Sequence, residues 1–272
     1  MHLPSPLEVL YEAAGQPSFD LPAALRDTYG GAFGLSEPLV YANFVSTIDG
    51  VVAIPSRPGS NKLVAGGAAS DRFVMGLLRA CADALVIGSG TMKASPKSVW
   101  TAEQAFPDTA AEFAELRRAI GRPEHAELVI LTGSGSIDPA HPAFATGALV
   151  LTSDAGAARL GGQLPAATTV VSLGPDPTLD ARTVVSTLRD RGHRLILSEG
   201  GPRVIGAFLE AQLVDELFLT VSPLLLGRTA AEERFALVED ADLIPSGPPG
   251  ATLLGVRRDG GHLFLRYALE KR

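Results

Sequence analysis

Hydrophobic and polar positions along the chain follow two periods, one typical of strands and one typical of helices. Residues 39–46, "LVYANFVS", form an apolar and aromatic run that predicts a strand, and "TIDG" ends it. In residues 69–83, apolar side chains recur at positions 73, 74, 77, 78 and 81, which is the period of a helix. Ser70 and Asp71 are candidate N-cap residues of this helix. The apolar run "ALVIG" that follows predicts a buried strand.

The same alternation of short apolar strands and amphipathic helices continues to about residue 212. This order is the signature of an α/β sheet whose strands are largely parallel. The predicted strands lie in residues 127–133, 148–153, 168–173 and 194–201, and the predicted helices in residues 107–120, 154–162, 179–192 and 202–212.

The two ends of the chain depart from this pattern. Residues 215–227 and 251–270 read as long strands, and Asp259, Gly260 and Gly261 predict a hairpin within the second segment. Residues 1–36 are interrupted by Pro and Gly and are expected to form an N-terminal extension that wraps the domain, with a short helix around Leu7 to Ala14. Residues 37–272 contain no linker or repeat and are expected to form one α/β domain, a mostly parallel sheet flanked by helices.

Composition and net charge indicate which kinds of molecule the protein is expected to bind. The chain has 272 residues, enough to bury a sizeable core, and a net charge of -7. A negative charge disfavours binding to a nucleic-acid backbone, which requires a basic face. No basic segment followed by an apolar stretch opens the chain, and no apolar run approaches the length of a membrane span. We therefore expect a cytoplasmic protein with a small-molecule substrate and neither a nucleic-acid nor a membrane partner.

Several common chemistries lack their residues in this chain. Its single cysteine, Cys81, excludes an internal disulfide and a multi-cysteine zinc site, and its place in a helical pattern favours a buried packing role. The five histidines are scattered, so no metal site is expected. The sequence has neither the Gly-x-Ser-x-Gly motif of serine hydrolases nor the phosphate loop of nucleoside triphosphatases.

Two glycine turns follow predicted strands: "GSGT" at Gly88 to Thr91 and "SEGGP" at residues 198–202. A glycine without a Cβ lets a phosphate approach backbone N–H groups and tolerates positive φ, and a helix that begins there adds a favourable dipole. Either turn alone could be structural. Together they favour one extended ligand that carries phosphate.

Asp49 follows a predicted strand and precedes a glycine. One interpretation is a turn-forming residue whose carboxylate bonds its own backbone. The other is a carboxylate at the mouth of a cleft that orients a substrate or assists proton transfer. The residues themselves leave both interpretations open.

Three blocks resemble the signature blocks of a known family, in order and at familiar spacing: "NFVSTIDGVVA", "LLRACADALVIGSGT" and "LSEGGPRVIGAFLEAQLVDELFLTVSPLLLG". The family is the reductase half of the bacterial bifunctional riboflavin-biosynthesis deaminase-reductase, whose fold is similar to that of dihydrofolate reductase. The resemblance covers about residues 38–268. It implies an NADPH-dependent oxidoreductase without metal or flavin, commonly a homodimer. Such an enzyme reduces the ribosylamino group of a 5-amino-6-(5-phosphoribosylamino)uracil-type pyrimidine phosphate to ribitylamino through the ring-opened imine.

The resemblance also implies roles for individual residues. Asp49 matches an aspartate of the family and is our candidate catalytic residue, whose charge would stabilise a protonated imine. Arg79, Glu199 and Thr47 are candidate substrate contacts. The implied cofactor-binding residues are Val45, Gly88, Ser89, Gly90, Thr91, Gly200, Gly201, Pro202, Arg203, Val204 and Ile205.

The chain also departs from the family. It lacks the His-x-Glu and Pro-Cys-x-x-Cys motifs of the deaminase half. Ser95 stands where the family often has aspartate, and residues 132–136 offer hydroxyls where relatives commonly have an arginine for the 2′-phosphate, so the choice between NADPH and NADH is open. An insertion at residues 92–126 contains Trp100, either a core residue or a wall of the substrate pocket. The alternatives are a reductase of dihydrofolate, a pterin or another cyclic imine, and a dinucleotide-binding sensor without catalysis.

Overall fold

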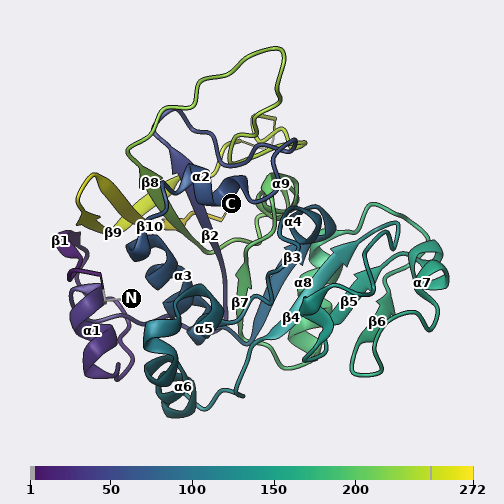
Figure 1. Cartoon of the computed structure of the whole chain (residues 1–272), viewed down its shortest axis with the longest axis horizontal. Coiled ribbons are helices and arrows are strands. Elements are labelled where there is room, and N and C mark those ends of the chain that lie inside the picture. Colours follow the sequence, from purple (N-terminus) through teal and green to yellow (C-terminus); the bar gives the residue numbers. More distant parts are fainter. Residues whose placement is uncertain (1–3, 246, 272) are drawn as a thin grey trace.

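The computed structural model describes residues 4–245 and 247–271, and a single ten-stranded sheet runs through them (Figure 1). The strand order is β1-β9-β10-β8-β2-β7-β3-β4-β5-β6. Neighbouring strands from β8 to β6 are parallel, whereas β1, β9, β10 and β8 pair antiparallel. The strands are β1 (Glu8–Glu12), β2 (Leu39–Thr47), β3 (Ala84–Gly88), β4 (Glu127–Thr132), β5 (Leu149–Thr152), β6 (Thr169–Ser172), β7 (Leu195–Ser198), β8 (Glu216–Ser222), β9 (Ala251–Asp259) and β10 (His262–Leu269).

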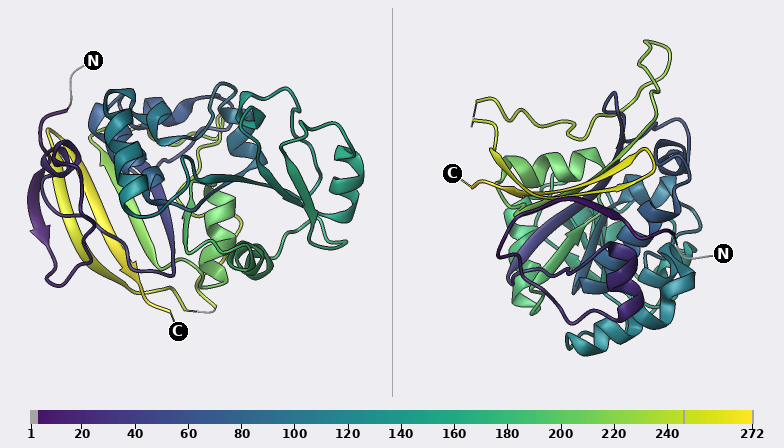
Figure 2. Two further views of the ribbon diagram at one scale, coloured as in Figure 1. Left: turned by 90° about the horizontal axis from the view of Figure 1, so that it is seen from below. Right: turned by 90° about the vertical axis from the view of Figure 1, so that its left-hand side faces the viewer.

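Helices cover both faces of the sheet, as the view from below shows (Figure 2). One core joins the sheet to α1, α3, α5 and α6, and a second core joins its opposite face to α8 and α9. The helices are α1 (Ala23–Tyr29), α2 (Ser60–Val64), α3 (Ala69–Cys81), α4 (Ser89–Ala94), α5 (Ala102–Ala105), α6 (Ala110–Ala119), α7 (Asp154–Leu160), α8 (Ala181–Asp190) and α9 (Pro202–Glu210). Among the described residues, none of these helices is long and apolar enough to cross a membrane.

The predicted α/β alternation and the C-terminal hairpin are confirmed. In the hairpin, His262 of β10 is the register partner of Asp259 in β9 across the glycine turn. The start of α3 differs from the prediction, because Ala68 occupies the N-cap position without a side-chain hydrogen bond. Ser70 and Asp71 lie inside the first turn, so they are not N-caps.

The N-terminal segment was expected to be helical around Leu7 to Ala14, and this prediction is wrong. Residues 8–12 form the edge strand β1, which pairs with β9. The guanidinium of Arg257 in β9 lies 2.6 Å from the Glu12 carboxylate and 3.8 Å from the centre of the Tyr29 ring. The strand that pairs with β1, and the arginine that binds Glu12, are about 245 positions away in the sequence. Such long-range partners override the local pattern, which alone cannot reveal them.

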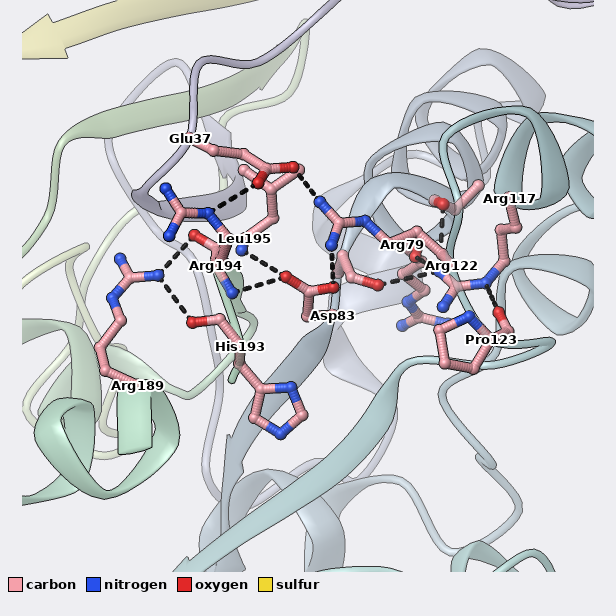
Figure 3. Close-up of polar contacts among 12 residues, drawn as sticks. Glu37, Arg79, Asp83, Arg117, Arg122, Pro123, Arg189, His193, Arg194 and Leu195 are labelled. Atoms are coloured by element: carbon pink, nitrogen blue, oxygen red, sulfur yellow. Dashed lines mark hydrogen bonds and ion pairs between the residues drawn. The ribbon is translucent and has the colours of Figure 1, made fainter. Parts of the chain in front are cut away.

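A polar network fastens the amino ends of β3 and β7 (Figure 3). The Asp83 carboxylate accepts hydrogen bonds from the backbone N–H groups of Arg194, at 2.6 Å, and Leu195, at 2.7 Å, and pairs with Arg122. Glu37 bridges the guanidinium groups of Arg122 and Arg194. These charges are satisfied within the network. Because they lie at the amino ends, the carboxyl ends of the strands remain the place for a ligand.

The insertion at residues 92–126 braces α3. Its helices α5 and α6 pack against α3, and the buried guanidinium of Arg117 in α6 donates to the carbonyl oxygens of Arg79, Ala80 and Ala82 (Figure 3). Those carbonyls lie at the C-terminal end of α3, where helix carbonyl groups lack intrahelical partners. The insertion therefore fixes the helix that carries the candidate site residue Arg79.

Candidate functional site

The two glycine turns meet at the carboxyl ends of β3 and β7, which are neighbouring parallel strands. A Cβ added to Gly88 would lie 3.0 Å from a methyl group of Val204 in α9, and one added to Gly200 would lie 2.5 Å from the other methyl group. A Cβ added to Gly201 would lie 3.4 Å from the Thr91 hydroxyl of α4. Turns that are 110 residues apart in sequence thus form one continuous surface.

Both turns open into helices with backbone N–H groups at their start. Gly88 is the N-cap residue of α4 and Gly201 that of α9, and in the described chain no side chain caps either helix. By contrast, α7 and α8 are capped by Ser153 and Asp180. Uncapped N–H groups at two adjacent helix starts can bind an anion such as the diphosphate of a dinucleotide.

The reason for glycine at these positions differs from the one expected. Gly88, Gly90, Gly200 and Gly201 all lie outside the positive-φ region, so their freedom to adopt that region is not needed. Gly88 and Gly200 are required because Val204 packs against them. Gly90 is exposed, and no described atom lies within 4 Å of a Cβ built on it. Its bare backbone is therefore available to a ligand.

The other candidate cofactor residues divide by exposure. Val45 in β2 and Ser89 in α4 are half-buried, whereas Ile205 is fully buried in the core under α9 and can offer only its backbone. The Arg203 side chain is exposed, forms an ion pair with Asp240 at 2.6 Å, and lies over the Phe235 ring.

Asp49 ties two loops together. Its carboxylate accepts hydrogen bonds from the Thr47 hydroxyl at 2.5 Å and from the backbone N–H groups of Leu226, at 3.2 Å, and Gly227, at 2.6 Å. The hydrogen bond from Thr47, followed by those from the backbone, lowers the Asp49 pKa below its ordinary value. Asp49 is therefore an anion near neutral pH. The Thr47 hydroxyl, which is buried, also accepts from Val51 N–H at 3.0 Å and serves the turn.

Arg79 and Glu199 form a buried ion pair. Arg79 Nη2 lies 2.6 Å from Glu199 Oε2, and Arg79 Nε lies 3.0 Å from Oε1. The remaining Arg79 nitrogen, Nη1, donates to the Thr101 carbonyl oxygen at 3.1 Å, just before α5. Only 8% of the Arg79 side chain and 9% of the Glu199 side chain are exposed. The two candidate substrate residues thus bind each other, and the insertion completes the coordination of the guanidinium.

Asp71 belongs to the same region, and our sequence analysis did not recognise it as a site residue. Its half-buried carboxyl group interacts with the hydroxyl of Thr220 in β8, and burial raises its pKa to about 6. The helical pattern could have revealed this residue. Position 71 precedes the buried positions Val74 and Leu78 by three and seven residues, so all three lie on the same face of the helix. A carboxyl group on the apolar stripe of a helix is unusual enough to indicate a function.

Trp100 and Cys81 belong to the core. The Trp100 side chain is buried among the core residues beneath α3 and stacks on His141 with ring centres 5.7 Å apart. This arrangement favours core packing over a wall of the substrate pocket. Cys81 is fully buried, and burial raises the pKa of its thiol to about 12, so the predicted packing role is confirmed.

Comparison with known structures finds the same fold in pyrimidine reductases. A pyrimidine reductase-like protein from Corynebacterium diphtheriae is 21% identical, with 93% of this chain and 96% of that chain covered and a TM-score of 0.65. RibD from Acinetobacter baumannii is 19% identical, with 91% and 61% covered and a TM-score of 0.63.

A third similar structure is a diaminohydroxyphosphoribosylaminopyrimidine deaminase/5-amino-6-(5-phosphoribosylamino)uracil reductase from Thermotoga maritima. It is 19% identical, with 86% of this chain and 57% of that chain covered and a TM-score of 0.61. This chain therefore spans somewhat more than half of the two longer proteins. A search of curated proteins found no match.

The family comparison covers most of the chain. The model described as the RibD C-terminal domain matches residues 38–259, from the start of β2 to the end of β9. The chain therefore belongs to the RibD C-terminal domain family, the pyrimidine reductases of riboflavin biosynthesis that the sequence blocks predicted.

Proposed function

We propose that the protein is an NADPH-dependent reductase that converts the ribosylamino group of a 5-amino-6-(5-phosphoribosylamino)uracil-type pyrimidine phosphate to ribitylamino. One observation carries this proposal: two uncapped glycine turns contact each other at the carboxyl ends of β3 and β7, with Glu199 directly before the second turn and Asp49 in the turn that follows the neighbouring strand β2. Family membership and this geometry both favour reduction. With one cysteine, the chain lacks the ligands of a zinc deaminase, so the proposal concerns reduction alone.

The chain's own groups fit a nicotinamide dinucleotide. The N–H groups at the starts of α4 and α9 would hold the diphosphate, and Val45 would border the nicotinamide. When bound, the cofactor supplies a hydride. The exposed Lys93 side chain of α4 extends to the loop after β4, where its Nζ atom lies 3.5 Å from the Ser136 hydroxyl. This cation and this hydroxyl would bind a 2′-phosphate. Lys93 thus supports NADPH over NADH.

The acidic groups suit an imine substrate. An imine carbon accepts hydride most readily when its nitrogen is protonated and positively charged, and a nearby anion stabilises that cation. Asp49 is such an anion, because its three hydrogen-bond donors keep it ionised. Glu199 is a second carboxylate, and its orientation is set by Arg79. We infer that Arg79 acts on the substrate through Glu199, since its own donors are occupied.

Replacing Asp49 with asparagine is expected to lower kcat by about 10²–10⁴ and to change NADPH affinity only a few-fold. The substitution keeps the size of the side chain but removes the charge that would stabilise the iminium. Steady-state kinetics and titration of NADPH fluorescence measure the two effects separately. A kcat within about threefold of the parent value would leave Asp49 as a turn residue that only joins the loops.

The decisive test of the proposed function is NADPH oxidation, followed with the ribosylamino-pyrimidine phosphate and with dihydrofolate in parallel. Oxidation that depends on the pyrimidine supports the proposal. Oxidation with dihydrofolate alone would favour the second reductase class, and tight NADPH binding without either activity would favour a sensor. The same assay with NADH tests the cofactor preference.

We also propose a cytoplasmic homodimer. Side chains of β8 alternate between buried and half-exposed, and the half-exposed face carries apolar residues on neighbouring strands: Leu219 is paired with Leu265, and Leu265 with Val256. A second copy of the chain would cover this face. Light scattering at micromolar concentration is expected to give the dimer mass, and Leu265→Asp the monomer mass. A monomer mass for the unsubstituted protein would contradict the proposal, and cell fractionation tests the location.

A further inference from the structure

Asp71 and Val45 face the same space on the α3 side of the sheet. In the parallel pair of β2 and β8, Val45 is in register with Thr220, so the two side chains point to the same face. Thr220 interacts with the Asp71 carboxyl group, which belongs to the first turn of α3. Asp71 is therefore adjacent to the position proposed for the nicotinamide. In Figure 1, α3 lies against this part of the sheet.

Glu199 completes this space from the other side. It follows β7, the strand on the far side of β2, and its charge is close enough to influence the Asp71 carboxyl group. A substrate bound beside Val45 would therefore have Asp71 on one side and Glu199 on the other.

Reduction of an imine requires a proton at nitrogen as well as a hydride at carbon, and the described site offers few proton donors. Asp49 accepts three hydrogen bonds and is ionised. The Glu199 carboxylate is paired with Arg79. The ring nitrogen Nε2 of His262 is 3.0 Å from the Ala65 carbonyl oxygen and is thereby occupied. Asp71 remains as the group that faces the site and can carry a proton.

We propose that Asp71 is the proton donor of the reduction, a role that rests on the proposed function. The lone pair of the imine nitrogen takes the Asp71 proton, and the electrons of the O–H bond stay on the carboxylate. Hydride then forms the new C–H bond, and the π electrons of the C=N bond become the lone pair of the amine nitrogen. Water returns a proton to Asp71 before the next cycle.

The surroundings of Asp71 support a donor that works near neutral pH. Burial is the main cause that raises its pKa to about 6, and the negative charge of Glu199 acts in the same direction. The Thr220 hydroxyl, His262 of β10 and Arg72 of α3 oppose the shift. Because a donor is active only when protonated, kcat should fall as the pH rises above about 6.

The test is the pH dependence of kcat in the full-length protein. Asp71→Asn is expected to lower kcat by about 10²–10⁴ and to abolish the decline above pH 6, with NADPH affinity unchanged. Asp71→Glu should restore part of the activity and keep a decline with pH. Asp154→Asn is the matched control, since Asp154 is an exposed carboxylate in the first turn of α7, and it should behave as the parent.

Two readouts separate failure of this inference from failure of the proposed function. The unsubstituted protein is assayed first, and no turnover with the pyrimidine would overturn the proposed reaction and the donor role with it. If the parent is active, an Asp71→Asn variant that keeps both its kcat and its decline with pH overturns the donor role alone. Infrared difference spectra of parent and Asp71→Asn should show a carboxyl group that titrates near pH 6, and its absence would also contradict the inference.

Discussion

Replacing Arg79 with methionine is expected to lower the free energy of unfolding by about 3–5 kcal/mol. The substitution removes the only cation that contacts the Glu199 carboxylate among the described residues, and that carboxylate is 9% exposed. A buried charge without a partner cannot recover the hydration that it lost on folding. Chemical denaturation monitored by circular dichroism measures the effect.

The double variant Arg79→Met with Glu199→Met separates stability from activity. Without either charge, the apolar side chains should restore most of the lost stability, because a buried ion pair is often replaced by hydrophobic residues at no net cost. Activity should stay low, since the carboxylate proposed to face the substrate is gone. If the double variant is as unstable as the single one, packing around Thr101 rather than charge pairing sets the stability.

Gly90→Val is expected to raise the Kd of NADPH at least about 100-fold, which corresponds to about 2.7 kcal/mol of binding free energy. The added side chain would enter open space in the structure, so the fold should tolerate it. That same space is where the diphosphate would approach the uncapped N–H groups of α4. Fluorescence titration of the folded variant measures the affinity.

Two further variants serve as controls for this result. Ala94→Val places the same β-branched side chain at an exposed position in the last turn of α4, so it tests the effect of a valine on this short helix without blocking the N-terminus. It should bind NADPH like the parent. Gly200→Ala is a poorer test, because its Cβ would lie 2.5 Å from Val204 and disturb the fold itself. Unchanged affinity in Gly90→Val would remove the phosphate-binding role of this turn.

The elements that sequence predicted well are those whose signal is local. The central strands β3, β5 and β7 are short apolar runs buried from both sides, and helices such as α8 show the apolar period of one buried face. The glycine turns could also be predicted from the sequence, since each follows such a strand. Their contact through Val204 could not be predicted, because it depends on β3 and β7 being neighbours in the sheet.

The parts that sequence missed depend on partners far away in the chain. Arg79 and Glu199 were each recognised as site residues, but nothing in two positions 120 residues apart reveals that they bind each other. The sequence predicts a helix cap at Asp71, because Asp is common at that position. Only the contact of Asp71 with Thr220 in β8 shows that its carboxyl group lies in a region of low hydration.

The pairing of β1 with β9 has a consequence for synthesis on the ribosome. The chain emerges from its N-terminus, so residues 8–12 leave the ribosome long before residues 251–259 exist. During that interval the backbone N–H and C=O groups of β1 have no partner strand, and its apolar side chains Val9, Leu10 and Tyr11, which are 42–47% exposed even in the folded chain, are open to solvent. The parallel strands can assemble during translation, whereas closure of this edge must wait until nearly the whole chain has been made. A chaperone that captures nascent chains would find its binding segment here.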